Sequence, residues 1–176
     1  MKDFTEQLIE KKTILEGKVL TVRVDRVCLV NGKEATREVV VHPGAVAVVP
    51  VLEDGSVLMV RQYRYPIGKM LLEIPAGKLE PGEDPEECAG RELEEETGYI
   101  AGRLKKLGSI YTAPGFSNEI LHIYLAEELK SSKQKLDEDE FLTVEKYTLA
   151  EVKTMLTDNT IEDAKSIAGL LLAGLK

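Results

Sequence analysis

Residues 76–99 read AGKLEPGEDPEECAGRELEEETGY, and this stretch decides the interpretation of the whole chain. Asp84 followed by Pro85 predicts the start of a helix, because aspartate is a favoured N-cap and proline suits the first helical position. Gly98 is placed to end that helix in a left-handed C-cap. The pattern therefore predicts a helix from Pro85 to about Thr97.

Three glutamates of this helix, Glu92, Glu95 and Glu96, are spaced i, i+3 and i+4 and share one face. Like charges at this spacing oppose helix formation by about 0.2–0.5 kcal/mol per pair. A divalent cation would offset the repulsion, and oxygen ligands without cysteine or histidine suit Mg²⁺ or Mn²⁺ rather than zinc. The alternative is an acidic helix face that is simply solvated.

The composition is that of a globular protein of one domain. The chain has 176 residues, 43% of them hydrophobic and 31% charged, and it carries a net charge of -8. The negative charge argues against nucleic acid and anionic membranes as partners, and no apolar run reaches the roughly 20 residues of a membrane helix. Two separated cysteines and no secretory signal predict a cytoplasmic protein.

The first part of the chain has the period of two that is typical of strands. Alternating residues in 19–25, a turn signal at Asn31-Gly32 and a second extended run in 37–41 predict an antiparallel meander. The apolar run at 45–52 predicts a strand buried on both faces. We therefore divide the chain into an N-terminal strand region, 1–43, with a role in dimerisation and in the substrate pocket, and a main domain, 44–176.

After the glutamate helix, the pattern predicts further strands, one polar and mobile loop at 131–140, and two C-terminal helices. The strands are expected at 56–63, 103–111, 120–126 and 142–147. The helices are expected at 149–156 and 161–175, with Thr160 as the cap of the second. The sum is an α/β fold, a mixed sheet sandwiched between helices.

The glutamate helix and the loop before it resemble the Nudix family. Gly77, five residues, Glu83, seven residues and then RELEEETGY from Arg91 reproduce the Nudix box, GX5EX7REUXEEXGU, in which U is a bulky aliphatic residue. The one departure is Tyr99 at the last U position. The resemblance implies an α+β fold of the Nudix type, an α/β/α sandwich, and metal-dependent hydrolysis of a nucleoside diphosphate linked to another group.

The resemblance also implies roles for residues of the box. Metal binding is expected from three carboxylates and one backbone carbonyl, those of Glu92, Glu95, Glu96 and Ala76. Glu83 and Arg91 are expected to hold the loop and the helix in register.

Gly90, inside the helix, costs about 1 kcal/mol relative to alanine. Either a close backbone approach or mere tolerance of the glycine accounts for it.

Outside the box, the chain is similar to the ADP-ribose pyrophosphatase branch, which carries a marker proline 15 residues after the box, as Pro114 is here. On this resemblance Arg64 is a candidate ligand of the diphosphate, since guanidinium binds phosphate in a bidentate manner. Glu119 is a candidate for polar contacts to the substrate. Arg37 would complete the adenine pocket of the neighbouring subunit, because this branch forms homodimers with exchanged N-terminal strands.

The reaction implied is attack of water on ADP-ribose to give AMP and ribose 5-phosphate. The branch places its general base on a late acidic loop, so Glu140 is our first candidate and Glu138 the second, with Glu95 as a further catalytic group. The alternative is that this acidic loop is simply solvated. Two alternatives to this function stay open: a Nudix hydrolase of an NDP-sugar or an oxidised nucleotide, and a sensor that binds ADP-ribose without turnover.

Overall fold

The structure is a computed structural model that describes residues 2–175. Its contacts divide the chain into two compact units. One unit comprises the chain up to Gly44 together with Tyr111–Ile120, and the other comprises Ala45–Ile110 and the chain from Leu121 onward. Within the described residues, no helix is long and apolar enough to cross a membrane.

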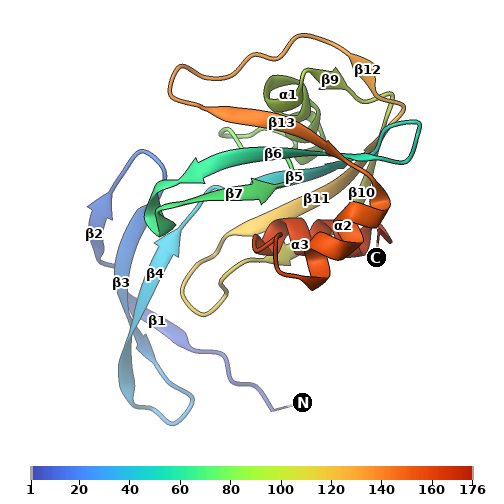
Figure 1. Ribbon diagram of the computed structural model, residues 1–176. Helices are drawn as coiled ribbons and strands as arrows, with labels where there is room; N and C mark the ends of the chain where they lie inside the picture. Colours follow the sequence, from blue (N-terminus) through green and yellow to red (C-terminus); the bar gives the residue numbers. More distant parts are fainter. Residues whose placement is uncertain (1, 176) are drawn as a thin grey trace. The chain divides into compact units, whose positions relative to one another are not determined.

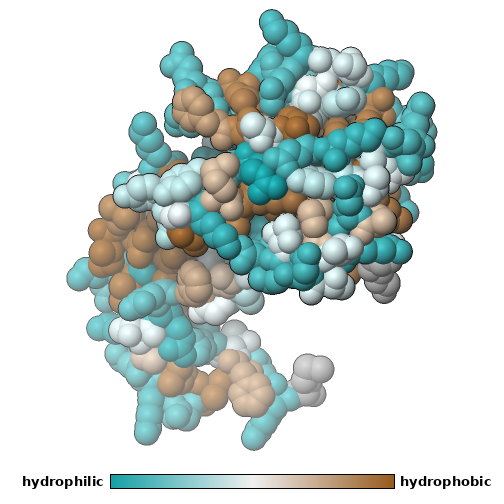
Figure 2. Space-filling view, viewed as in Figure 1, coloured by the Kyte–Doolittle hydropathy of each residue, from teal (hydrophilic) through white to brown (hydrophobic). Residues whose placement is uncertain are grey.

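The first unit contains an antiparallel sheet in which β3 pairs with each of the other three strands. Its strands are β1 (Gln7–Glu10), β2 (Thr13–Glu16), β3 (Thr21–Cys28) and β4 (Glu34–Val41). Gly32 takes a positive φ of 80° in the turn between β3 and β4, as the Asn-Gly signal predicts. Figure 2 shows hydrophobic surface in the region of β2, where Ile14 and Leu15 are exposed.

The segment 111–120 joins this unit because it is bonded to the end of β4. Val40 donates its N–H to the carbonyl of Phe116 at 2.7 Å, and Asn118 donates to the carbonyl of Val40 at 3.3 Å. The Asn118 side chain also accepts from the N–H of His42 at 2.8 Å. The loop that carries Pro114 is therefore fixed to the N-terminal strands.

As far as residue 175, where the described part of the chain ends, the second unit holds nine strands and three helices. The strands are β5 (Ala45–Pro50), β6 (Val57–Arg64), β7 (Lys69–Glu73), β8 (Ala76–Lys78), β9 (Tyr99–Ile100), β10 (Arg103–Tyr111), β11 (Ile120–Glu127), β12 (Lys130–Ser131) and β13 (Leu142–Tyr147), with the ends of β10 and β11 reaching into the first unit. The helices are α1 (Pro85–Thr97), α2 (Leu149–Thr157) and α3 (Ala164–Leu172), and a 3₁₀ turn covers Tyr65–Ile67.

This unit has one mixed sheet and two antiparallel ones. One has the order β10-β11-β5-β8, in which β5 runs parallel to β11 and antiparallel to β8. A second, antiparallel sheet has the order β13-β6-β7, and β12 pairs with β9. Figure 1 shows α1 on one side of these strands and α2 and α3 on the other.

Strand β5 is the centre of this sandwich, because all six of its residues are buried. Val46 and Val48 pack with the buried face of α1, which includes Leu93. Ala47 and Val49 belong to the opposite core, with side chains from the two C-terminal helices. The expectation of a strand buried on both faces is confirmed, and it gives the α/β/α layering.

The cap of the last helix was predicted wrongly. Helix α3 begins at Ala164 rather than at residue 161, and its cap is Asp163, whose carboxylate accepts from the N–H of Ser166 at 2.9 Å. Ile161 is fully buried and donates its N–H to Met155, so this residue lies in the connection between the helices. Burial of an apolar residue thus overrides the local cap signal at Thr160.

Two helical glycines have different surroundings. A Cβ on Gly90 would meet only Leu104, at 3.6 Å, which is an ordinary contact. A Cβ on Gly169 would lie 2.7 Å from Ile74 and 3.1 Å from Val49, inside the buried core. A close approach therefore exists at Gly169, while Gly90 is tolerated without one.

We expect Gly90→Ala and Gly169→Ala to change stability in opposite directions. Alanine at residue 90 should raise the free energy of unfolding by up to about 1 kcal/mol through helix propensity. At residue 169 the same gain is outweighed by overpacking, which costs about 1–3 kcal/mol. Urea unfolding of both variants measures this, and a stabilised Gly169→Ala protein would contradict the packing described.

Candidate functional site

Helix α1 begins and ends where its sequence predicts. The Asp84 side chain accepts a hydrogen bond from the N–H of Glu86 at 2.8 Å, and Pro85 occupies the first helical position. Gly98 closes the helix with a positive φ of 71° and donates to the carbonyl of Glu94. These caps fix which helical positions turn toward β8 and the loop that follows it.

Gly77 lies on β8 directly against the Glu92 side chain. A Cβ at residue 77 would lie 1.8 Å from the carboxyl carbon of Glu92, so any side chain there would displace the Glu92 carboxylate. The absence of a side chain at Gly77 leaves room for the Glu92 carboxylate.

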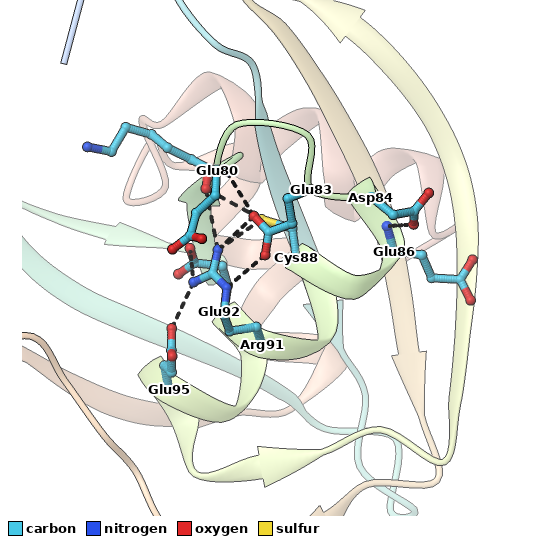
Figure 3. Close-up of polar contacts among 9 residues, drawn as sticks. Glu80, Glu83, Asp84, Glu86, Cys88, Arg91, Glu92 and Glu95 are labelled. Atoms are coloured by element: carbon cyan, nitrogen blue, oxygen red, sulfur yellow. Dashed lines mark hydrogen bonds and ion pairs between the residues drawn. The ribbon is translucent and has the colours of Figure 1, made fainter.

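Arg91 joins three carboxylates of this region (Figure 3). Its guanidinium makes a two-point pair with Glu83, through Nε at 2.9 Å and Nη2 at 3.1 Å. The Nη1 group donates to Glu92 at 2.8 Å and to Glu95 at 2.9 Å. The bonds from Arg91 lower the pKa of Glu83 to about 2, so the expected pairing of these two residues is confirmed and it holds the loop to the helix.

Glu96 is the most buried carboxylate of the cluster, with a relative exposure of 1%. It accepts a hydrogen bond from the N–H of Ala76 at 3.0 Å. Burial, with repulsion from Glu140, raises the pKa of Glu96 to about 8. Burial also raises the pKa of Glu92. The structure thus places Ala76 beside Glu96 and joins Glu92 and Glu95 through Arg91.

Of the two candidate bases, Glu140 is the partly buried one. A turn in which the N–H of Glu140 donates to the carbonyl of Asp137 at 3.0 Å precedes β13. The side chain of Glu140 is partly buried, which raises its pKa, and its charge acts on Glu92 and Glu96. Glu138 is exposed at the tip of the same turn.

The polar segment 131–140 is a loop after Ser131, and its first half is hydrogen-bonded to α1. Ser131 pairs with Tyr99 in a short antiparallel ladder. Ser132, Gln134 and Lys135 then donate hydrogen bonds to the carboxyl end of α1. Sequence reasoning missed these contacts because they join residues about 40 positions apart in the chain.

Arg64 is held by a buried carboxylate that the sequence analysis did not identify. Its Nε and Nη2 bind the two oxygens of Glu73 at 2.7 and 2.6 Å, and Lys165 of α3 pairs with the same carboxylate. Burial opposes ionisation of Glu73, but these two cations outweigh it and its pKa is lowered. The charges of Lys165 and Arg64 also act on Glu96 and Glu140 respectively. A glutamate at the end of β7, next to the box, was the signal available in the sequence.

The other expected substrate ligands belong to the first unit. Arg37 pairs with Glu6, with its Nε 2.9 Å from the carboxylate. Glu119 accepts from the hydroxyl of Thr112 at 2.5 Å and lies 3.6 Å from the His42 ring. Pro114 is exposed in the turn that follows β10. Their partners are local, within this unit.

The carboxylates fit a divalent cation by their chemistry, although protein donors hold them here. Within residues 2–175, no group of three or more acidic, histidine or cysteine side chains is arranged to hold a metal ion. Arg91 instead binds Glu92 and Glu95, and the backbone of residue 76 binds Glu96. Hard oxygen donors with repulsion among them are what Mg²⁺ or Mn²⁺ neutralises.

Comparisons with known proteins agree with this architecture. A sequence profile of the NUDIX domain matches residues 41–170. The chain is 48% identical to an ADP-ribose pyrophosphatase of Bacillus subtilis (100% of this chain, 96% of the relative) and 46% identical to a methanol dehydrogenase activator of Bacillus methanolicus (94% and 91%). The crystal structure of an ADP compounds hydrolase superposes with a TM-score of 0.87 at 26% identity, covering 99% of this chain and 95% of that one.

The Arg91–Glu83 pair predicts a contribution to acid stability. The pKa of Glu83 is about 2 in the fold against an ordinary value of 4.5, so its ionised form stabilises the protein above about pH 4.5. This contribution is lost as the pH falls from about 4.5 toward 2. We expect the free energy of unfolding of Glu83→Gln, measured with urea, to depend less on pH in this window than that of the wild type.

Glu87→Gln is the matched control, because Glu87 is exposed on the first turn of the same helix. Its acid profile should follow that of the wild type. Identical profiles for the wild type and Glu83→Gln would show that the ion pair does not stabilise the fold.

Proposed function

The chain belongs to the Nudix family, and from this premise we propose that it hydrolyses the diphosphate bond of ADP-ribose with Mg²⁺ as cofactor. The products are AMP and ribose 5-phosphate. The substrate is supported by the relative named for this activity, which is 48% identical over the whole chain. The reaction is supported by the carboxylates that gather around α1 and the late loop.

The observation that carries the proposal is the gathering of carboxylates on α1, where Glu92 and Glu95 share the Arg91 guanidinium and Glu96 accepts from the N–H of Ala76. Glu92 and Glu96 both experience the charge of Glu140, and Glu140 in turn experiences that of Glu95. Like charges held close together do not stabilise a fold. At a site that binds cations, the same carboxylates serve as ligands. Their proximity therefore supports a functional rather than a structural role.

The metal ligands in this proposal are the carboxylates of Glu92, Glu95 and Glu96, with the carbonyl of Ala76. A bound divalent cation supplies Lewis acidity, since it neutralises charge on the diphosphate and makes water a better nucleophile. Mn²⁺ has the same preference for oxygen ligands and is expected to substitute. In this proposal Arg91 would turn away from Glu92 and Glu95 when they bind metal, and it would keep its pair with Glu83.

Glu140 acts as the general base, and Glu138 is the second candidate. The oxygen of the attacking water forms a bond to one phosphorus, and the bond between that phosphorus and the bridging oxygen breaks. The base takes the proton of the water, and the bridging oxygen leaves with the other phosphate. Burial raises the pKa of Glu140, which makes it a better proton acceptor than an exposed carboxylate.

Arg64 binds the diphosphate in this proposal, because a guanidinium held at its Nε and Nη2 by Glu73 has a fixed orientation and one terminal nitrogen left for phosphate. Glu119 makes polar contacts to the substrate, and Pro114 is a further residue of the substrate site. Arg37 completes the adenine pocket of the neighbouring subunit in a homodimer, with the strand region 1–43 as the dimerisation element. The protein acts in the cytoplasm on this small-molecule substrate.

The direct test is to incubate the protein with ADP-ribose and Mg²⁺ and to measure AMP and ribose 5-phosphate by chromatography. We expect both products in equal amounts, and none after addition of EDTA. A panel with an NDP-sugar and an oxidised nucleotide compares substrates. Faster cleavage of another diphosphate would reject ADP-ribose while keeping the reaction, and binding of ADP-ribose without any cleavage would indicate a sensor.

Glu96→Gln tests the metal site. We expect turnover to fall by at least about 100-fold, the upper range for changes to the partners of metal ligands, while the far-UV circular dichroism stays unchanged. Glu86→Gln, exposed on the first turn of the same helix, is the control and should keep wild-type turnover. Near-normal activity of Glu96→Gln would remove this residue from the site.

Multi-angle light scattering tests the homodimer. We expect twice the mass of 19.5 kDa for the wild type. Ile14 is 56% exposed on β2. The substitution Ile14→Glu places a charge there and should weaken the dimer. Leu172→Glu, on the exposed side of α3, is the control. A monomer at all concentrations would contradict the role of the N-terminal strands.

A further inference from the structure

The loop between β12 and β13 is anchored to the carboxyl end of α1. The N–H of Ser132 donates to the carbonyl of Gly98 at 2.6 Å, and the N–H of Lys135 donates to the carbonyl of Glu95 at 3.0 Å. The amide Nε2 of Gln134 donates to the carbonyl of Glu96 at 2.6 Å. The last carbonyls of a helix lack partners within the helix, and here the loop supplies them.

Two further features tighten this anchor. The hydroxyl of Ser132 donates to the Glu94 carboxylate at 2.6 Å. A Cβ on Gly98 would lie 3.0 Å from the backbone nitrogen of Gln134, so the loop packs closely on the helix end. Gly98 therefore caps the helix and also leaves room for the loop beside it.

The anchor leaves only a short free segment around Glu140. Lys135 is bonded to α1, and Leu142 already pairs with Gln62 in the ladder between β13 and β6. Six residues, 136–141, connect these two fixed points, and a turn closed by Glu140 shortens their path. Six extended residues span at most about 20 Å, and the turn shortens this further, so the two fixed points restrict the positions that Glu140 can take.

From this geometry we infer that Gln134 is a positioning residue, which fixes Glu140 relative to the carboxylates of α1 by holding the loop to the carbonyl of Glu96. This inference rests on the proposed function, in which Glu140 is the base. Ser132 supports the same anchor through Glu94. Substitution of Gln134 tests the anchor selectively, because its side-chain bond can be removed without disturbing the two backbone bonds.

The test is a double-mutant cycle between Gln134 and Glu140. Gln134→Ala removes the donor, and Gln134→Glu keeps the size of the side chain but replaces the donor with an acceptor. Each is combined with Glu140→Gln and assayed at saturating Mg²⁺ with the diphosphate that the wild type cleaves fastest. Lys133→Ala is the control, since Lys133 is exposed between the two anchoring side chains.

We expect both Gln134 variants to lower kcat about 10-fold with KM within about twofold, because a displaced base slows the proton transfer without weakening substrate binding. In the Glu140→Gln background, Gln134→Ala should lower kcat by less than about twofold. A purely structural role would give the same loss in both backgrounds and would overturn the inference. Full kcat in Gln134→Ala would overturn it as well.

Further results separate a failure of this inference from a failure of the proposed function. If Gln134→Ala does not fold, Ser132→Ala carries the cycle, with a smaller loss that also disappears in the Glu140→Gln background. Full activity of Glu140→Gln alone would reject the base and the inference together. Cleavage of a diphosphate other than ADP-ribose would reject only the proposed substrate, since the cycle is run with whichever diphosphate is cleaved.

Discussion

The site depends on the way in which Arg91 balances the negative charge of its own helix. Glu92, Glu95 and Glu96 would repel one another on one helical face, and burial of Glu92 and Glu96 increases the cost of their ionisation. The guanidinium binds two of these carboxylates and also Glu83 of the preceding loop. One side chain thus holds the loop on the helix and offsets part of the repulsion.

The neighbouring elements place the other residues of the site around this interaction. Strand β8 brings Gly77 against Glu92 and the N–H of Ala76 to Glu96. The late loop brings Glu140, and β6, β7 and α3 bring Arg64, Glu73 and Lys165 respectively. The buried carboxylate of Glu73 is compensated by two cations, as a buried charge requires. Both cations also act on Glu96, one of the proposed metal ligands.

Much of the fold and of the candidate site could be predicted from the sequence where local chemistry decides the structure. The caps at Asp84 and Gly98, the buried run at Ala45 and the turn at Gly32 are short-range signals, and the structure follows them. Asp163 was missed in favour of Thr160 because the burial of Ile161 depends on packing that no local signal contains. Glu73, Lys165 and Gln134 were missed for the same reason, since their partners are distant in the chain.

The central claim is that Glu92, Glu95 and Glu96 form a divalent metal site once Arg91 releases the first two. Its most direct measurement is anomalous diffraction from crystals of the protein grown with Mn²⁺. The account predicts a manganese peak beside Glu92 and Glu96, with Arg91 withdrawn from Glu92 and Glu95 but still paired with Glu83. Manganese bound elsewhere, or a guanidinium that keeps all three carboxylates in its presence, would contradict it.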